Sequence, residues 1–307
     1  MALGIATRDS RLLTALYIAF ATHAGLDGLT RSDRIAADEL ERRGSAVIPV
    51  PWSSTRDWTQ FDAVCIRATW DYYQRPADFL AWLRMLEGER VPLWNSARLA
   101  SWNMQKGYLR DLERAGVLVV PTVWVSQSSG TGSLAQLVRT HGWGDVVVKP
   151  AVSANANRTW RTRGAVTEQD EGEFSGLVQA GDAMVQPLIE SLVRDGEWSF
   201  IFLGGEFSHA VLKRPASGDF RVQSIHGGTV SQARPRDEWV SQARAALVPV
   251  TDPWLYARVD GCIVDGKFVL VELEMLEPDL FFNLAPESAV RFADSLESMV
   301  KSIVSKR

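Results

Sequence analysis

Cysteine, histidine and net charge are all scarce in this sequence of 307 residues. The two cysteines, Cys65 and Cys262, each lie in an apolar, β-rich run, which favours core residues over a disulfide and suits a reducing cytoplasm. The four histidines show no zinc-ligand spacing, and no Ser/His/Asp or Cys/His arrangement is visible. A formal net charge of −4 gives no electrostatic reason to expect nucleic acid or a membrane as a partner.

The sequence also lacks a hydrophobic run long enough to cross a membrane. The apolar stretch at residues 12–25 carries polar side chains and is too short to span a bilayer. We interpret residues 15–22 as the first buried strand and residues 1–14 as an N-terminal extension. No GxxxxGK(S/T) motif occurs, which excludes a P-loop nucleotide site.

What is present is the composition of an ordinary globular protein, with 46% apolar and 23% charged residues, at a length that predicts two or three units. The first hundred residues alternate strand-like and helix-like patterns, which is typical of βαβ units and predicts a parallel sheet. Strands are expected at 15–22, 45–52, 61–68 and 91–94, and helices at 32–44, 76–87 and 102–116. The first helix should begin at Ser32 or Asp33 and end at Gly44.

The pattern changes from residue 117 onward. Short strands, loops and short helices follow, as in a small separate α+β unit, and then strands and turns continue to an amphipathic helix expected at 286–304. We therefore predict a protein of α/β and α+β class with three domains. They are an N-terminal parallel α/β domain at 1–105, a small central domain at 106–188 and a C-terminal α+β domain at 189–307.

Three carboxylates mark the last two predicted strands. Asp265-Gly266 is a hairpin turn sequence, so Asp260 and the Glu272/Glu274 pair should come from adjacent strands. Residues two apart on a strand face the same side, so both glutamates should point one way. The three carboxylates can therefore converge on a hard cation such as Mg²⁺, although an isolated E-x-E pair is more often a solvated strand face.

Two lysines precede this hairpin. Lys149 directly follows an apolar strand, where a lysine is either at an exposed strand end or pointed into a site. Lys106 lies on the helix expected at 102–116, where a surface position is the ordinary interpretation. Neither lysine defines a site when it is taken alone.

A basic loop lies between Lys149 and the hairpin. Lys213, Arg214 and Arg221 surround a Pro/Gly turn that is followed by the Gly227-Gly228 pair. Such a cluster is usually solvated surface. Basic side chains on a glycine-flanked loop also suit a phosphoryl-transfer site, because that chemistry requires a covered γ-phosphate and charge stabilisation on its oxygens.

The segment RATWDYY follows a predicted strand of the parallel sheet, where α/β proteins open their binding crevices. Arg67 could clamp a substrate carboxylate, Asp71 could hold an amine, and Trp70 and Tyr72 could wall a pocket. Alternatively, the aromatic residues pack beneath the following helix and Asp71 caps a turn.

The order of these elements resembles the ATP-grasp superfamily, particularly its glutathione-synthetase-like branch. The shared order is a helical lysine, a strand lysine followed by proline, a VQP hinge, a basic glycine loop and an acidic hairpin, from about residue 18 to the end. Longer segments resemble the subgroup that includes the D-cycloserine-forming synthetase of antibiotic biosynthesis. These segments are RATWDYY, WNMQKGYL, VVVKPAVSA, GEWSFIFLGGEFSHAVLKRP, GDFRVQ, GGTV and YARVD…VELEMLEP. The resemblance implies a three-domain ATP-grasp fold whose central domain is a lid.

The resemblance also implies a nucleotide and metal site. The side chains that would bind ATP are Lys106 and Lys149 at the phosphates, Gln186, Pro187 and Leu188 at the adenine, and Glu190 or Glu197 at the ribose. The ion, Mg²⁺ or alternatively Mn²⁺, would be carried by Asp260, Glu272 and Glu274. Glu274 departs from the commonest ATP-grasp pattern, which has asparagine at this position, so the number of bound metals stays open.

The remaining implied roles concern catalysis and the substrate. Arg221 and Arg258 would face the γ-phosphate or the acyl phosphate, with Lys213 and Arg214 as support. The substrate would meet Arg67, Trp70, Asp71, Tyr72, Gly227 and Gly228.

The implied activity is an ATP-dependent ligase that forms an amide-type C–N bond through an acyl phosphate, on a small amino-acid-like substrate. Two substrate modes stay open: an intramolecular cyclisation of the D-cycloserine type, and an intermolecular ligation of two amino acids. A kinase that stops at phosphorylation and a non-catalytic ATP-binding regulatory module are the rival classes. Dimers are common in similar enzymes, so the resemblance also allows a homodimer.

Overall fold

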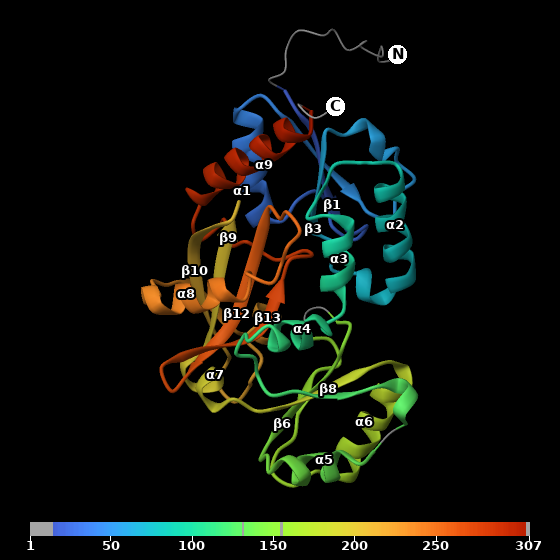
Figure 1. Cartoon of the computed structure of the whole chain (residues 1–307), viewed down its shortest axis with the longest axis vertical. Coiled ribbons are helices and arrows are strands. Elements are labelled where there is room, and N and C mark those ends of the chain that lie inside the picture. The colour runs from blue at the N-terminus through green and yellow to red at the C-terminus, as the bar shows by residue number, and fades with distance from the viewer. Residues whose placement is uncertain (1–14, 131, 154–155, 305–307) are drawn as a thin grey trace.

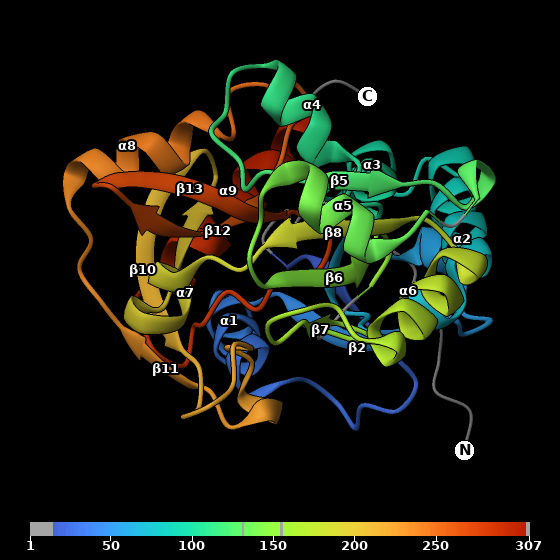
Figure 2. The same ribbon diagram turned by 90° about the horizontal axis from the view of Figure 1, so that it is seen from below.

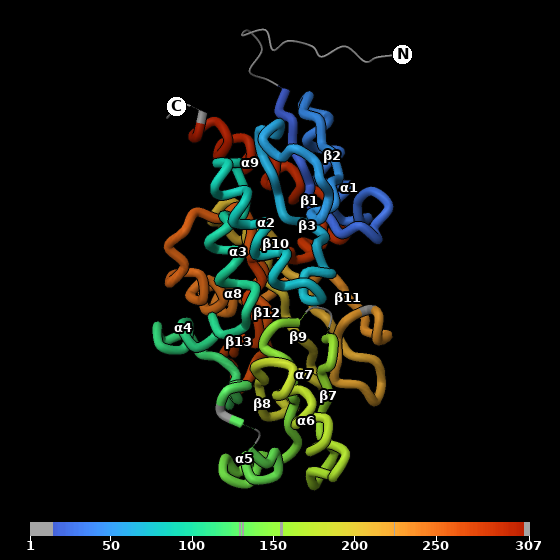
Figure 3. Tube along the Cα trace, turned by 90° about the vertical axis from the view of Figure 1, so that its right-hand side faces the viewer, coloured from blue at the N-terminus to red at the C-terminus, as the bar shows by residue number. Residues whose placement is uncertain are grey.

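The structure is a computed structural model that describes residues 15–130, 132–153 and 156–304. It contains three β-sheets, with the N-terminal sheet at the top of Figure 1, the C-terminal sheet in the middle and the central sheet at the bottom. Figure 3 shows the same order from a second side. The N-terminal extension expected at 1–14 lies outside the described residues.

The N-terminal sheet is parallel, with strand order β2-β1-β3-β4, as the βαβ pattern predicts. Its elements are β1 Tyr17–Thr22, α1 Arg31–Arg42, β2 Ala46–Pro51, η1 Trp58–Gln60, β3 Ala63–Ala68, η2 Tyr72–Gln74, α2 Pro76–Gly88 and β4 Leu93–Trp94. The N-cap of α1 is Thr30 and not Ser32 or Asp33, because the Thr30 side chain accepts the Asp33 N–H. Gly44, with φ +94°, follows the end of the helix as expected.

Alternation along β1 divides the surrounding core into two sides. Ile18 and Phe20 pack with α1 and with the last helix, α9 (Ser288–Val304), whereas Ala19 and Ala21 pack toward α2 and α3 (Ala97–Met104). Figure 1 shows α1 and α9 on one side of the sheet and α2 and α3 on the other. The last helix therefore covers the first strand, and α9 and β1 share one core.

The two cysteines are free and buried, which confirms the prediction of core residues. In the part of the chain that the structure describes, no helix combines the length and apolarity needed to cross a membrane.

The segment expected as one helix at 102–116 consists of two. Helix α3 ends at Met104, and α4 spans Tyr108–Arg114. Between them Gln105 is extended, and the Lys106 N–H donates to the Ala151 carbonyl at 2.8 Å, so the helical hydrogen bonds do not continue. The prediction of Lys106 on a helix was wrong: it lies in a bend that is bonded to the segment after β6 (Val146–Pro150).

The central sheet is antiparallel, with strand order β5-β8-β6-β7. Its elements are β5 Val123–Val125, η3 Gln127–Ser129, α5 Leu134–His141, β6 Val146–Pro150, β7 Trp160–Arg161, α6 Glu168–Ala180 and β8 Ala183–Pro187. Helices α5 and α6 cover one face (Figure 2), where Phe174 packs with Val146 and Val185 in a separate core. Alternation leaves Lys149 and Gln186 on the opposite face.

The C-terminal sheet is antiparallel, with strand order β11-β10-β9-β12-β13. Its elements are α7 Glu190–Asp195, β9 Glu197–Leu203, β10 Glu206–Arg214, η4 Ser224–His226, β11 Thr229–Gln232, α8 Asp237–Ala245, β12 Tyr256–Val264 and β13 Lys267–Glu274. Asp265 and Gly266 have φ of 49° and 79°, as a two-residue hairpin turn requires. The predicted acidic hairpin is therefore confirmed.

Arg67 does not act as the predicted substrate clamp in this structure. Its side chain is 1% exposed, and its guanidinium donates to Asp33 Oδ1 at 2.8 Å and to the Pro278 carbonyl at 2.9 Å. Asp33 is itself buried in the first turn of α1, so Arg67 binds a carboxylate of its own chain. This pair ties β3 to α1 and to the segment after β13.

Replacing Arg67 with methionine (Arg67→Met) should lower the free energy of unfolding by about 3 to 5 kcal/mol, because Asp33 would remain buried without its partner. Urea denaturation measures this change. The control is Arg114→Met, which removes an exposed ion pair to Asp111 and should leave stability nearly unchanged. A stable Arg67→Met protein that has lost substrate affinity would restore the clamp role.

Candidate active site

A cavity of about 490 Å³ lies between the central and C-terminal sheets. Lys149 and Gln186 line it from β6 and β8, Asp260 and Glu272 line it from β12 and β13, and Trp70 reaches it from the N-terminal sheet. All three predicted domains thus contribute to one cavity, whose size is typical of a small-molecule site.

The cavity is densely charged. Among the described residues, the charged side chains that line it are five basic residues, Lys106, Lys149, Lys213, Arg221 and Arg258, and six acidic residues, Glu197, Asp260, Glu272, Glu274, Glu277 and Asp279. Because buried charge is costly unless it is compensated, the pairing of these groups shows where a ligand is needed.

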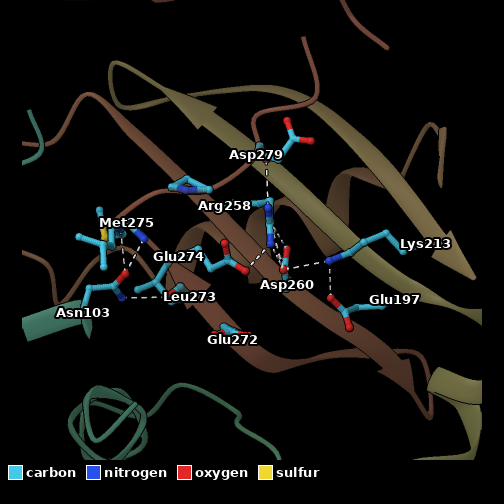
Figure 4. Close-up of polar contacts among 12 residues, drawn as sticks. Asn103, Glu197, Lys213, Arg258, Asp260, Glu272, Leu273, Glu274, Met275 and Asp279 are labelled. Atoms are coloured by element: carbon cyan, nitrogen blue, oxygen red, sulfur yellow. Dashed lines mark hydrogen bonds and ion pairs between the residues drawn. The ribbon is translucent and has the colours of Figure 1, made fainter. Parts of the chain in front are cut away.

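The register of the acidic hairpin places its charges on one face. In the antiparallel register of β12 and β13, Asp260 lies opposite Glu272, and Arg258 lies opposite Glu274 (Figure 4). Leu273 lies between the two glutamates and packs into the core on the other face. The prediction that Glu272 and Glu274 face the same way is confirmed.

Asp260 is held by two cations. Arg258 donates to both of its carboxylate oxygens from 3.0 Å, and the Lys213 ammonium donates to Oδ2 at 3.0 Å (Figure 4). Burial would raise the pKa of Asp260, but these two cations lower it below its usual value. Lys213 also forms an ion pair with Glu197 at 2.6 Å. Asp260 therefore has few oxygen lone pairs left for a further ligand.

Glu274 and Glu272 are less completely engaged. Arg258 forms an ion pair with Glu274, yet burial raises the pKa of Glu274 to about 7. Glu272 accepts from the Lys106 ammonium at 2.9 Å, and that ammonium also donates to the Ser153 carbonyl at 3.0 Å. The side chains of Glu272 and Glu274 remain 28% and 26% exposed, so both can turn an oxygen toward the cavity.

Lys149 differs from the other buried cations. Only 9% of it is exposed, and no hydrogen bond or ion pair engages its ammonium within the described ranges. Burial lowers the pKa of Lys149, although Glu272 in the neighbourhood acts in the opposite direction. A buried ammonium without a partner that faces a cavity is suited to an anionic ligand.

The predicted metal ligands do not form a ready-made cage. Among the described residues, no three His, Cys, Asp or Glu side chains lie in an arrangement that could hold a metal ion. Asp260, Glu272 and Glu274 each face a basic partner instead. The convergence expected for these three carboxylates is thus only partial, because ion pairs compete for them.

Asn103 fixes the end of the acidic strand. Its amide donates to the Leu273 carbonyl at 2.8 Å, and its oxygen accepts the N–H groups of Met275 and Leu276 at 2.7 and 3.0 Å (Figure 4). One side chain of α3 thereby satisfies the backbone where β13 stops. The position of Glu274 depends on this contact, which no local sequence pattern indicates.

The VQP hinge reaches the cavity. Gln186, Pro187 and Leu188 all line it. A backbone donor to adenine has to come from Leu188 or a neighbour, and the Leu188 N–H already donates to the Asp145 carbonyl at 2.8 Å. The next N–H, that of Ile189, therefore becomes the candidate donor, since proline has none.

Of the two carboxylates predicted at the ribose, Glu197 and Glu190, one lines the cavity and the other does not. Glu197 lines the cavity, and burial raises its pKa despite the ion pair with Lys213. Glu190 is exposed at the start of α7 and does not line the cavity. Of the two, only Glu197 is placed to meet a ligand there.

The basic loop is divided between cavity and solvent. Lys213 and Arg221 line the cavity, and Arg221 forms an ion pair with Asp219 at 2.8 Å. Arg214 is exposed, because alternation turns it to the other side of β10. Its position therefore does not support the role predicted for it beside the phosphate.

The Gly227-Gly228 pair does not line the cavity either. A Cβ on Gly228 would collide with the Val222 carbonyl, and the Gly228 N–H donates to Gln223. These glycines therefore allow the loop to close on itself and do not contact the substrate space.

In the aromatic segment after β3, some of the predicted residues line the cavity and one does not. Trp70 and Tyr72 line the cavity as predicted. Asp71 does not: its carboxylate accepts from the Trp52 indole N–H at 2.7 Å and pairs with Arg75. The amine-binding role predicted for Asp71 has no support in its position.

Two acidic residues in the cavity have no predicted role, Glu277 and Asp279. They belong to the segment LEPD directly after β13, so the sequence signal was their closeness to Glu274. Asp279 accepts the Phe281 N–H at 2.8 Å, whereas Glu277 is 9% exposed. Burial and then Glu274 raise the pKa of Glu277 well above its ordinary value.

The cavity lies between a central antiparallel sheet and an acidic C-terminal hairpin, with lysines from both sides, which is the arrangement that the ATP-grasp resemblance implies. Solved structures confirm the fold. The D-alanine–D-alanine ligase of Bacillus anthracis complexed with ATP has a TM-score of 0.66 at 12% identity, over 95% of this chain and 99% of that one. The chain has the fold of ATP-grasp ligases and is an ATP-dependent ligase, as the order of its motifs predicts.

Within this class the chain is similar to D-cycloserine synthetase. Residues 18–95 match the family of the N-terminal domain of D-cycloserine synthetase DcsG. The cycloserine biosynthesis protein DcsG of Streptomyces lavendulae is 29% identical over 261 residues, which cover 80% of this chain and 86% of the relative. The crystal structure of D-cycloserine synthetase DcsG has a TM-score of 0.82 at 26% identity, over 92% of this chain and 99% of that one.

A relative from the predicted branch also matches. The glutathione synthetase of Prochlorococcus marinus (strain MIT 9313) is 26% identical over 275 residues, which cover 84% of this chain and 82% of the relative. This supports the glutathione-synthetase-like branch.

Proposed function

We propose that the cavity binds Mg-ATP, activates a carboxylate of a small amino-acid-like substrate as an acyl phosphate, and lets an amine-type nitrogen capture it. The observation that carries this proposal is Lys149, a buried ammonium that faces a cavity next to carboxylates and has no hydrogen bond or ion pair to any described residue. Such a group can accept an anion such as a phosphate as a directly bonded partner.

The other nucleotide contacts follow from the lining residues. Lys106 would reach the phosphates beside Lys149, and the segment Gln186–Ile189 would receive the adenine. Glu197 would meet the ribose, and Arg221 and Arg258 would stabilise charge on the transferring phosphoryl oxygens.

The donor set fits a magnesium ion. Mg²⁺ is usually held by one or two carboxylates together with substrate phosphates, so a complete protein cage is not needed. Glu272 and Glu274 are the partly exposed carboxylates that would hold it, and Asp260 could join them only by exchanging Lys213 or Arg258 for the ion. Burial, together with Glu272 and Asp260, raises the pKa of Glu274 despite the Arg258 guanidinium, so a further positive charge would favour its ionised form. A bound Mg²⁺ would supply that charge and offset the phosphates.

The chemistry then requires positioning and charge stabilisation. A substrate carboxylate oxygen forms a bond to the γ-phosphorus, the bond to the β–γ bridging oxygen breaks, and ADP leaves. The amine nitrogen next attacks the acyl carbon, the C–O bond to phosphate breaks, and the amine loses a proton. No side chain serves as a covalent nucleophile, which agrees with the lack of a nucleophile motif in the sequence.

The finer proposal is an intramolecular ring closure. It is supported by the similarity to D-cycloserine synthetase over most of the chain. Ligation of two separate amino acids is the alternative, and the D-alanine–D-alanine ligase shows the same fold.

A panel of D- and L-amino acids and O-substituted serines, incubated with the protein, ATP and Mg²⁺, tests both levels. We expect phosphate release that depends on the added substrate. Mass spectrometry then separates the two modes: a ring has the mass of one substrate less water, whereas a dipeptide combines two substrates. Tight ATP binding without phosphate release for every member of the panel would contradict a ligase function.

A further inference from the structure

Glu277 is a buried carboxylate without a partner. It lines the cavity and is 9% exposed, and across the described residues its carboxylate takes part in no hydrogen bond or ion pair. The proposed nucleotide and metal contacts do not use it. A carboxylate in this state needs a cation or a donor from outside the protein.

Two basic side chains influence Glu277, but both are already engaged elsewhere. Arg258 and Lys106 act on the pKa of Glu277, but Arg258 is bonded to Asp260 and Glu274, and Lys106 to Glu272. Neither cation forms an ion pair with Glu277. Among the described residues, the protein's own cations therefore leave the Glu277 carboxyl group without an ion-pair partner.

The surroundings of Glu277 suit a small organic cation. Trp70, Tyr72 and Phe281 line the same cavity, and burial and then the Glu277 charge raise the pKa of Tyr72. Aromatic faces attract ammonium groups, and a carboxylate orients them. A phosphate would be repelled here.

We propose that Glu277 binds the protonated amino group of the amino-acid-like substrate and so orients its carboxylate for activation. The inference rests on the proposed function and adds the group that recognises the substrate. It assigns to Glu277 the role that the sequence had suggested for Asp71. It also predicts discrimination between amino acids and acids that lack the amino group.

Glu277→Gln tests this role, because it keeps the size of the side chain and removes its charge. With the panel amino acid that supports phosphate release, KM should rise about tenfold to a hundredfold, while KM for ATP stays within about twofold. With the analogue in which hydrogen replaces the amino group, such as propionate for alanine, the variant and the unmodified protein should behave alike. Glu287→Gln, at an exposed site further along the chain, is the matched control.

The outcomes are distinguishable. An unchanged KM for the amino acid would overturn the role of Glu277 while leaving the ligase function intact. A raised Mg²⁺ requirement with a raised KM for ATP would identify Glu277 as a metal ligand, and this also overturns the proposal. If the unmodified protein releases no phosphate with any substrate, the ligase function fails. Thermal-shift titrations with the same amino acid and analogue pairs then decide on Glu277, since stabilisation by the amine should be lost only in Glu277→Gln.

Discussion

Lys149→Met should strongly reduce ATP-dependent turnover and at the same time make the ligand-free protein more stable. The ammonium is buried and has no protein partner in the described ranges, so an apolar side chain of similar length removes a desolvation cost. We expect a gain of roughly 1 to 3 kcal/mol in the free energy of unfolding. Turnover should fall by about 10²- to 10³-fold or more, because a charge that stabilises the phosphates is lost.

Two measurements on one protein preparation test this prediction: thermal denaturation without ligand, and phosphate release with ATP and substrate. Lys267→Met is the control, since Lys267 is exposed beside the hairpin turn and should change neither quantity. A Lys149→Met protein with normal KM for ATP would show that the phosphates bind elsewhere in the cavity.

The two glutamates of the acidic hairpin should respond differently to loss of charge. Glu272→Gln should reduce turnover by about 10²- to 10³-fold, because it removes both a proposed metal ligand and the ion pair with Lys106. Glu274→Asn should keep turnover within about tenfold of the unmodified protein. It supplies the amide oxygen that is common at this position in ATP-grasp enzymes and removes a carboxylate that burial already disfavours.

Steady-state kinetics over a Mg²⁺ titration measure this contrast, and circular dichroism checks that both variants fold. Equal losses in the two variants would mean that both glutamates are needed as charged ligands. A fully active Glu272→Gln would place the metal away from β13.

The acidic hairpin could be predicted because its determinants are local. Asp265-Gly266 fixes the turn, and the two-residue period fixes the face of Glu272 and Glu274. The parallel N-terminal sheet followed from the alternation of patterns in the same way. The class of enzyme followed from the order of several weak motifs.

The partners of individual charges could not be predicted, since they come from distant parts of the chain. Arg67 reaches Asp33 and the carbonyl of Pro278, and neither is near it in sequence. The break at Lys106 depends on a hydrogen bond to Ala151 that apolar periodicity does not reveal. Glu277 has no ion pair among the described residues because Arg258 is bonded to Asp260 and Glu274, and Lys106 is bonded to Glu272.

The separate core of the central sheet has a consequence for how substrates come and go. Phe174 and its neighbours close that core without residues from the other two sheets, whereas Met184 and Trp124, on the opposite face of the central sheet, pack with the C-terminal core. The N-terminal and C-terminal sheets are instead tied together, because Phe20 and Phe292 pack in one core and Tyr256 donates to the carbonyl of Ile66. We therefore expect the central unit, which carries Lys149 and the hinge, to move when nucleotide is exchanged. The N-terminal and C-terminal sheets should hold the rest of the cavity in place during this movement.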